Sequence, residues 1–207
     1  MSPRFIRSSD DKRRAGVRFI EARSPKLNRR VRLYGRHAFE LWLLLESDPT
    51  ITALCERPIL MDDPSRAIDF WVQSNEREQF LQIGDDPPAA PSIPNFPGIP
   101  LRNVPLAELA AHRQWLANCE RMLPYINGCC GVDLAALEDS IVRFVNEPLQ
   151  LSRIEREFAM GDPSVVRAAL FSALLVGRVH SADLRTHPLS TLTIFSTTKS
   201  IHESPAR

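Results

Sequence analysis

The feature that most constrains this fold is an apolar stretch, His37–Leu45, which carries a single acid, Glu40. Leucine and aromatic residues fill most of its other positions, so a helix here is predicted to be buried on most sides. A carboxylate inside such a helix needs an ionic partner, a metal ion or an opening to solvent. The helix therefore either presents Glu40 to a functional site or turns it toward its one wet face.

Short apolar segments with strand-like composition follow this helix. Ile51–Cys55 and Ile59–Met61 are the first two. Ala67–Ser74 alternates in polarity, which predicts a strand with Ile68, Phe70 and Val72 on one face and Asp69, Trp71 and Gln73 on the other. After a polar turn, Gln79–Ile83 is predicted to return beside it. The pattern indicates an antiparallel pair within an α+β core.

Asp69 and Gln82 are the polar residues that this pairing is expected to bring together. Two carboxylates that converge on such a pair, with backbone carbonyls, offer the hard oxygen ligands that suit Mg²⁺. A metal-bound water then serves as the nucleophile, and a nearby lysine usually steadies the developing charge on a phosphate. This pattern points toward metal-dependent phosphodiester chemistry.

The same residues resemble the N-terminal catalytic domain of TnsA-type endonuclease subunits of heteromeric transposases, which have a PD-(D/E)xK nuclease core. The resemblance covers about residues 28 to 84 and weakly includes the C-terminal third. It rests on four features: the helix with Glu40, the turn Ser47–Ile51, Glu56–Pro58, and the Asp69-Phe70 pair. It implies a restriction-endonuclease-like mixed sheet with flanking helices.

The resemblance also implies roles for particular residues. Glu40 and Asp69 match the metal ligands, so Mg²⁺ is the implied cofactor, and Gln82 matches the third catalytic residue. The lysine expected two positions later is replaced by Gly84, and the proline expected before Asp69 is replaced by Ile68. The missing lysine indicates a degraded site.

Two functions follow from the resemblance. The first is a subunit that cuts DNA at the 5′ ends of a mobile element beside a DDE-type transposase and an ATPase regulator, with catalysis impaired at Gly84. The second is a catalytically inactive subunit kept for DNA binding and assembly. A third interpretation, a winged-helix DNA-binding regulator unrelated to transposition, is also open.

Charge is distributed unevenly along the chain. Met1–Arg36 holds twelve Lys/Arg and three Asp/Glu, a net charge of +9, whereas the rest of the chain carries −8. Residues 1–28 are predicted to form a disordered basic arm, which either is a simple tail or lies along DNA phosphates. A transit peptide is a further alternative for this arm, although three acids interrupt it. The arginines predicted to contact DNA are Arg13, Arg14, Arg29, Arg30, Arg32, Arg36, Arg167 and Arg178.

Proline punctuates the middle of the chain. After a predicted nuclease-like core at 29–86, residues 87–105 contain seven prolines and are expected to form an extended linker or a long loop. Asp85 and Asp86 precede this segment, either as solvated turn residues or as extra oxygen ligands. Residues 106–196 are predicted to form a helical region, and residues 197–207 a polar tail.

The helical region is predicted to end in a winged helix-turn-helix at 152–195. Leu106–Met122 and Val132–Val145 have helical periodicity. A capping box at Ser152–Glu155 and an Asp162 cap before Ser164–Leu175 predict two more helices. Strands are expected at Val179–Ala182 and Thr191–Phe195.

The second helix of this winged unit, Ser164–Leu175, offers few polar side chains. Base readout usually needs several Arg, Asn or Gln residues, so protein docking or nonspecific contact is favoured over sequence reading. Arg178 remains available to touch phosphates.

Cysteine content and hydropathy bear on the compartment. The four cysteines, Cys55, Cys119, Cys129 and Cys130, show no zinc-binding spacing and are expected to be reduced. The N-terminus lacks the apolar stretch of a secretory signal, and no apolar run is long enough to cross a membrane. We therefore expect a cytoplasmic protein with no membrane partner.

Overall fold

The computed structural model describes residues 3–9, 16–59, 68–75, 77–86, 92–93 and 96–197. They fall into two compact units. The first unit contains Met1–Glu46 and Thr50–Ala111, and the second contains Ser47–Pro49 and His112–Arg207. No helix within the described ranges is long and apolar enough to span a membrane.

The first unit begins with an antiparallel hairpin and a helix. Strands β1 (Phe19–Ser24) and β2 (Arg29–Tyr34) pair along their full length, and Asn28 takes a positive φ of 50° in the turn between them. Helix α1 (Arg36–Glu46) follows and packs on β2. Strand β1 lies inside the segment that the sequence predicted to be a disordered arm, so the ordered core begins earlier than expected.

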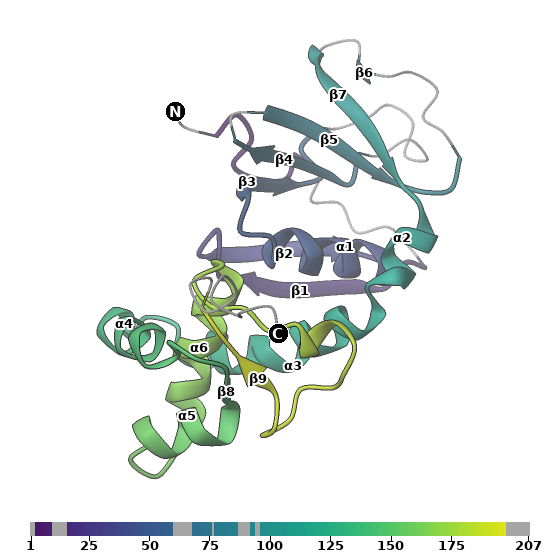
Figure 1. Cartoon of the computed structure of the whole chain (residues 1–207). Helices are drawn as coiled ribbons and strands as arrows, with labels where there is room; N and C mark the ends of the chain where they lie inside the picture. The colour runs from purple at the N-terminus through teal and green to yellow at the C-terminus, as the bar shows by residue number, and fades with distance from the viewer. Residues whose placement is uncertain are drawn as a thin grey trace. The chain divides into compact units, whose positions relative to one another are not determined.

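A mixed sheet forms the rest of the first unit (Figure 1). Strand β4 (Phe70–Ser74) runs antiparallel to both β3 (Ile51–Glu56) and β5 (Arg77–Ile83), whereas β7 (Phe96–Val104) runs parallel to β5. A two-residue strand, β6 (Ser92–Ile93), extends the edge. The expected α+β class with a mixed sheet flanked by helices is confirmed. The predicted strand Ile59–Met61 falls largely outside the described residues.

Strand β7 occupies part of the segment expected to be a proline-rich linker. Its pairing with β5 uses Leu101–Val104, while Pro97 and Pro100 precede that stretch. Proline has no N–H to donate to a neighbouring strand, so it is tolerated in the part of β7 that does not pair with β5. The first unit therefore continues through β7 and helix α2 (Leu106–Ala111).

Aromatic side chains pack one face of this sheet. Trp71 and Phe80 are opposite each other on β4 and β5, both are fully buried, and Phe5 from the N-terminal segment lies 5.4 Å from the Trp71 ring. Ile68 joins the same cluster as Trp71. The predicted alternation therefore fails just before β4, since Ile68 was expected on the face opposite Trp71.

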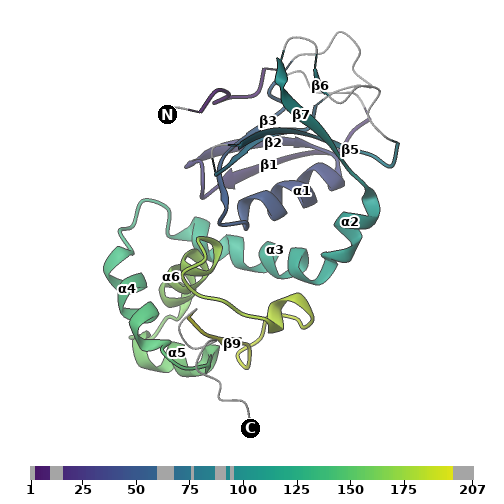
Figure 2. The ribbon, with the colours of Figure 1, turned by 45° about the horizontal axis from the view of Figure 1, so that its top comes forward.

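The second unit is helical. It contains α3 (Arg113–Gly128), α4 (Ala135–Phe144), α5 (Leu151–Phe158) and α6 (Ser164–Leu175), with a 3₁₀ turn at Asp183–Arg185. The predicted helix Leu106–Met122 is instead two helices, α2 and α3, which are separated at His112. Strand β8 (Leu149–Gln150) pairs with β9 (Ile194–Phe195), and both are labelled in Figure 1. Figure 2 shows helices α3 to α6 of this unit from another side.

Helix α6 is the core of the second unit. Eight of its twelve residues are buried, and it packs against α3, α4 and α5. The helix begins at Ser164 and its N-cap is Pro163, one residue later than the predicted cap, while the Asp162 carboxylate accepts a hydrogen bond from Ser164 N at 2.9 Å. At the other end, the N–H groups of Gly177 and Arg178 bond the carbonyls of Leu174 and Ala173, and Gly177 has a φ of 76°. This is a Schellman ending, which glycine permits.

Two local predictions in this unit are wrong. Ser152 lies inside α5 and makes no capping bond, because the helix begins at Leu151. The first N–H groups of α5 instead donate to the Thr193 and Thr191 carbonyls, so a neighbouring segment replaces the side-chain cap. The predicted strand Val179–Ala182 is reduced to one bridge between His180 and Ser196.

Candidate functional site

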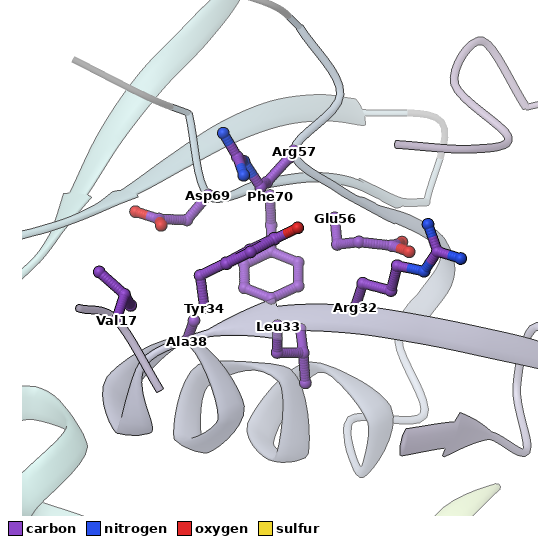
Figure 3. Close-up of a pocket in the computed structure, with 9 residues that line it drawn as sticks. All are labelled: Val17, Arg32, Leu33, Tyr34, Ala38, Glu56, Arg57, Asp69 and Phe70. Atoms are coloured by element: carbon purple, nitrogen blue, oxygen red, sulfur yellow. The ribbon is translucent and has the colours of Figure 1, made fainter. Parts of the chain in front are cut away.

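A small cavity of about 70 Å³ lies in the first unit beside the predicted strand acid (Figure 3). Strand β2 supplies Arg32, Leu33 and Tyr34, and α1 supplies Ala38. The far wall comes from the end of β3 and the start of β4. Its polar lining is Arg32, Tyr34, Glu56, Arg57 and Asp69.

Asp69 lies immediately before β4, where the sheet ladder ends. Its N–H donates to the Leu81 carbonyl at 3.0 Å, and its carboxylate oxygen Oδ2 accepts from Ile83 N at 2.7 Å. The carboxylate therefore continues the β4–β5 ladder by one bond. The lining of the cavity includes Asp69 together with Phe70, whereas the alternating pattern predicted that these two residues point to opposite faces.

Glu56 is the second acid at the cavity. It is 3% exposed and forms a bidentate ion pair with Arg29, at 2.7 and 2.6 Å. The hydrogen bonding that Arg29 donates to Glu56 is the main cause that raises the pKa of Arg29, and burial opposes it. A buried carboxylate held this way is neutralised by a fixed partner.

Arg57 brings a positive charge to the same cavity. It follows β3 with a positive φ of 44°, and its guanidinium lies 4.7 Å from the Tyr34 ring centroid. The side chain is nearly buried, so the ring supplies part of the stabilisation that water would give. Figure 3 shows Arg57 above Tyr34, and Asp69 on the side of Tyr34 that is away from its hydroxyl.

The other two predicted catalytic residues do not line this cavity. Glu40 is on α1, one turn after Arg36, and the two form an ion pair at 2.8 Å. Gln82 is on β5, opposite Asn103 of β7. The structure thus gathers Asp69 from the predicted set with Glu56, Arg57 and Tyr34. Glu56 and Arg57 belong to the short Glu-Arg-Pro sequence, but nothing in their spacing signalled that they would line the same cavity as Asp69.

The position expected to hold a lysine is open. Gly84 follows Gln82 by two residues, has no positive φ, and a Cβ built there meets nothing within 4 Å. Lys26 does not lie at the cavity, because its Nζ donates to the Leu45 carbonyl at 2.9 Å at the end of α1. The nearby acid Glu46 is buried and accepts bonds from Ser24 Oγ and Lys26 N. Burial raises the pKa of Glu46, and these bonds oppose the shift.

Most of the arginines predicted to contact DNA are engaged with carboxylates. Besides Arg29 and Arg36, Arg30 pairs with Glu21, Arg167 with Glu155, and Arg178 with Asp139. Arg32 lines the cavity. Arg13 and Arg14 lie outside the described residues.

Comparisons with protein-family models and with curated proteins found no match for this chain.

Proposed function

We propose that this chain is a TnsA-like subunit of a DNA transposition complex, that it binds DNA and assembles with a DDE-type transposase, and that its isolated form does not cut DNA. The order of elements supports the nuclease-like ancestry. Helix α1 carries Glu40, Asp69 flanks β4, and Gln82 lies on the returning strand β5 of a mixed sheet. This order along the chain is the one that the resemblance predicts, and it supports the proposal.

The carboxylates in this arrangement do not fit a Mg²⁺ site as they stand. Mg²⁺ needs several oxygen ligands around it, but Glu40 is paired with Arg36 and Glu56 is paired with Arg29. The positive Arg57 lines the cavity with Asp69. A second cation beside these charges is electrostatically unfavourable. We therefore derive no metal-dependent step for this chain.

One observation carries the inactive interpretation: Glu40 is ion-paired at 2.8 Å while Gly84 stands where the family has lysine. Losing one preorganised electrostatic contact of this kind typically costs about a hundred- to a thousandfold in rate. The Glu40 carboxylate would be held by Arg36 instead of a metal ion, and the lysine charge would be absent at Gly84.

The second unit supports an assembly role. Helix α5, a tight turn, helix α6 and then the short β-segments follow the order of a winged helix-turn-helix. Yet α6 is buried, and its Arg167 is held by Glu155 and Tyr125. A helix with so few exposed polar groups is poorly suited to reading bases, which favours contacts with protein.

A cleavage assay tests this proposal. The full-length protein, Asp69→Asn, Gly84→Lys and the control Gly98→Lys are incubated with element-end DNA and Mg²⁺, with and without the DDE-type transposase. Asparagine at 69 keeps an acceptor for Ile83 N–H but removes the charge. Lysine fits at both glycines, since neither has a positive φ or a neighbour within 4 Å.

In the absence of the transposase, we expect neither the wild type nor Asp69→Asn to cut DNA. In its presence, we expect the complex with Asp69→Asn to cut the 5′ ends to the same extent as the complex with the wild type. Robust cutting by the wild type that Asp69→Asn abolishes would overturn the inactive interpretation and support the plain endonuclease. Gly98→Lys shows whether an added positive charge alone changes DNA affinity.

DNA binding is tested separately through the basic N-terminal segment. Replacing Lys12, Arg13 and Arg14 with serine should lower affinity equally for all sequences. It should also reduce the slope of log K against log salt by about 3, one for each lost phosphate contact. Serine at the exposed Arg113, Arg153 and Arg156 of the second unit is the matched control. An unchanged slope in the first variant would show that this segment does not bind DNA.

A further inference from the structure

The second unit contains a larger pocket, of about 480 Å³, apart from the nuclease-like region. It lies where α3, the start of α5, α6 and the segment before β9 meet. Phe171 and Leu151, both buried, lie at its base, and Pro124, Tyr125 and Leu189 add apolar lining. A volume of this size and an apolar lining are typical of pockets that bind a ligand or an anchoring side chain.

Arg167 is positioned in this pocket by two fixed bonds. Its Nε donates to Glu155 Oε1 at 2.5 Å, and its Nη1 donates to the Tyr125 hydroxyl at 2.7 Å. The guanidinium also lies 5.1 Å from the centroid of the Tyr125 ring. Its other terminal nitrogen, Nη2, donates to no atom in the described part of the chain. The guanidinium is therefore oriented before any ligand arrives.

Arg121 contributes a second positive charge from α3. It is exposed, and its hydrogen bond is to the Leu189 carbonyl at 3.2 Å. Among the described residues, no carboxylate pairs with it, in contrast to Arg29, Arg36 and Arg178. An arginine next to a pocket and without a carboxylate retains its full charge for an incoming anion.

Hydroxyl groups complete the polar lining. Ser190 Oγ accepts a bond from Leu192 N, which leaves its proton for another acceptor, and Thr191 is exposed beside it. No acidic side chain lines the pocket among the described residues. The lining is thus a set of hydrogen-bond donors around an apolar base, which selects for an anion that carries an apolar group.

The pocket fits an acidic peptide better than a nucleic acid. Binding of single strands depends on stacking of bases on aromatic faces, but Tyr125 has Arg167 over its ring and Phe171 against it at 5.9 Å. The second unit also carries ten basic and eleven acidic residues, so it has no general attraction for a polyanion. The lining of this pocket, by contrast, carries two arginines, Arg121 and Arg167.

We propose that this pocket binds a short acidic peptide segment of a partner protein, with one Leu or aromatic side chain seated on Pro124 and Leu189 and a carboxylate held by Arg121 and Arg167. The proposal does not depend on the nuclease-like site. It also differs from docking on the face of α6, because eight of the twelve residues of that helix are already buried.

Random peptides displayed on phage are selected on the full-length protein and counter-selected on Arg121→Gln. We expect the enriched sequences to combine Asp or Glu with one Leu, Phe or Trp. Synthetic versions should bind Arg121→Gln about 10- to 100-fold more weakly, since a hydrogen bond to a charged group is lost. Arg113→Gln, an exposed arginine on the same helix, is the control and should bind like wild type.

A second variant separates volume from charge. Thr191→Phe leaves the charge unchanged but fills the exposed mouth of the pocket, so it should also block binding. Enrichment of peptides without acids, equal binding by Arg121→Gln and Arg113→Gln, or unimpaired binding by Thr191→Phe would each overturn the proposal. A short single-stranded oligonucleotide that loses affinity only with Arg121→Gln, without enrichment of acidic peptides, would assign the pocket to DNA instead.

Discussion

The two units bury polar side chains in different ways. The first unit buries charges, namely Glu46, Glu56 and Arg57, and it gives the two glutamates fixed donors. The described part of the second unit buries neutral groups, Asn118 and Thr193. Asn118 alone donates to the Leu184 and His187 carbonyls and accepts from Leu189 N. The buried carboxylates of the first unit thus have an arginine, a hydroxyl and a backbone N–H as donors, whereas the buried amide of Asn118 in the second unit bonds only backbone groups and a neutral side chain.

This difference shows what a motif in the sequence can and cannot reveal. The spacing of acids in the first unit resembles that of a nuclease, yet Glu40 and Glu56 already form ion pairs with arginines of the same chain. The hydrogen-bond donors that can still take an anion are in the second unit, at Arg121 and at Nη2 of Arg167, where the sequence has no recognisable motif. The hydrogen-bond partners, rather than the residue types, decide which groups remain available for a ligand.

The largest effect is expected from a charge placed in the apolar interior of the second unit. Leu170 is fully buried on α6, so Leu170→Asp should destabilise the second unit by more than about 4 kcal/mol. Hydrogen exchange should show lost protection across residues 112–197, with the first unit still protected. Val165→Asp, at a 41% exposed position of the same helix, is the control. Retained protection in Leu170→Asp would contradict the assignment of α6 as the core.

The next effect tests the charge pairs of the first unit. Arg29→Gln leaves Glu56 buried without its partner and should cost about 3–5 kcal/mol in free energy of unfolding. Arg30 is its neighbour on β2, but its ion pair with Glu21 is exposed. Arg30→Gln should therefore cost less than about 1 kcal/mol. Equal costs in urea unfolding would show that burial does not distinguish the two pairs.

The two interiors should also differ in their response to pH. Burial raises the pKa of Glu46 above its ordinary value near 4.5. Its contribution to stability is therefore present below that value and is lost as pH rises through the folded-state pKa. Relative to Glu46→Gln, the wild type should gain stability as pH falls from neutral toward 4. The cost of Asn118→Leu should not change with pH, because no proton is involved. A constant difference between wild type and Glu46→Gln would contradict the shift.

The smallest effect concerns the thiols. Each unit contains one buried cysteine, and burial raises the pKa of both Cys55 and Cys119 to about 12. Cys130 is exposed and Cys129 is partly exposed. A thiol reagent at neutral pH should label the latter two and spare the former two, since the thiolate is the reactive form. Fast labelling of Cys55 would show that the first unit opens readily.

Sequence patterns predicted much of the sheet and the helices. A short apolar segment located β3, alternation located β4, a polar turn located the returning strand β5, and a capping signal located α6. Strand β1 was missed because Phe19–Ser24 lies in a basic segment, and β7 was missed because its prolines precede the paired stretch. The cavity could not be predicted, because Arg57 meets Tyr34 only through the packing of β2 against β3. Long-range contacts of this kind leave no periodic signal in the chain.

Residues Ser47–Pro49 belong to the second unit, although the chain on either side of them belongs to the first. Trp115 Nε1 donates to Ser47 Oγ at 2.9 Å, and a Cβ at Gly177 would come within 3.0 Å of Pro49. A gene fragment that starts at His112 would lose both contacts, leaving an indole N–H without its acceptor. The second unit is therefore encoded by two separate stretches of the gene, and a fragment that starts at His112 lacks one of them.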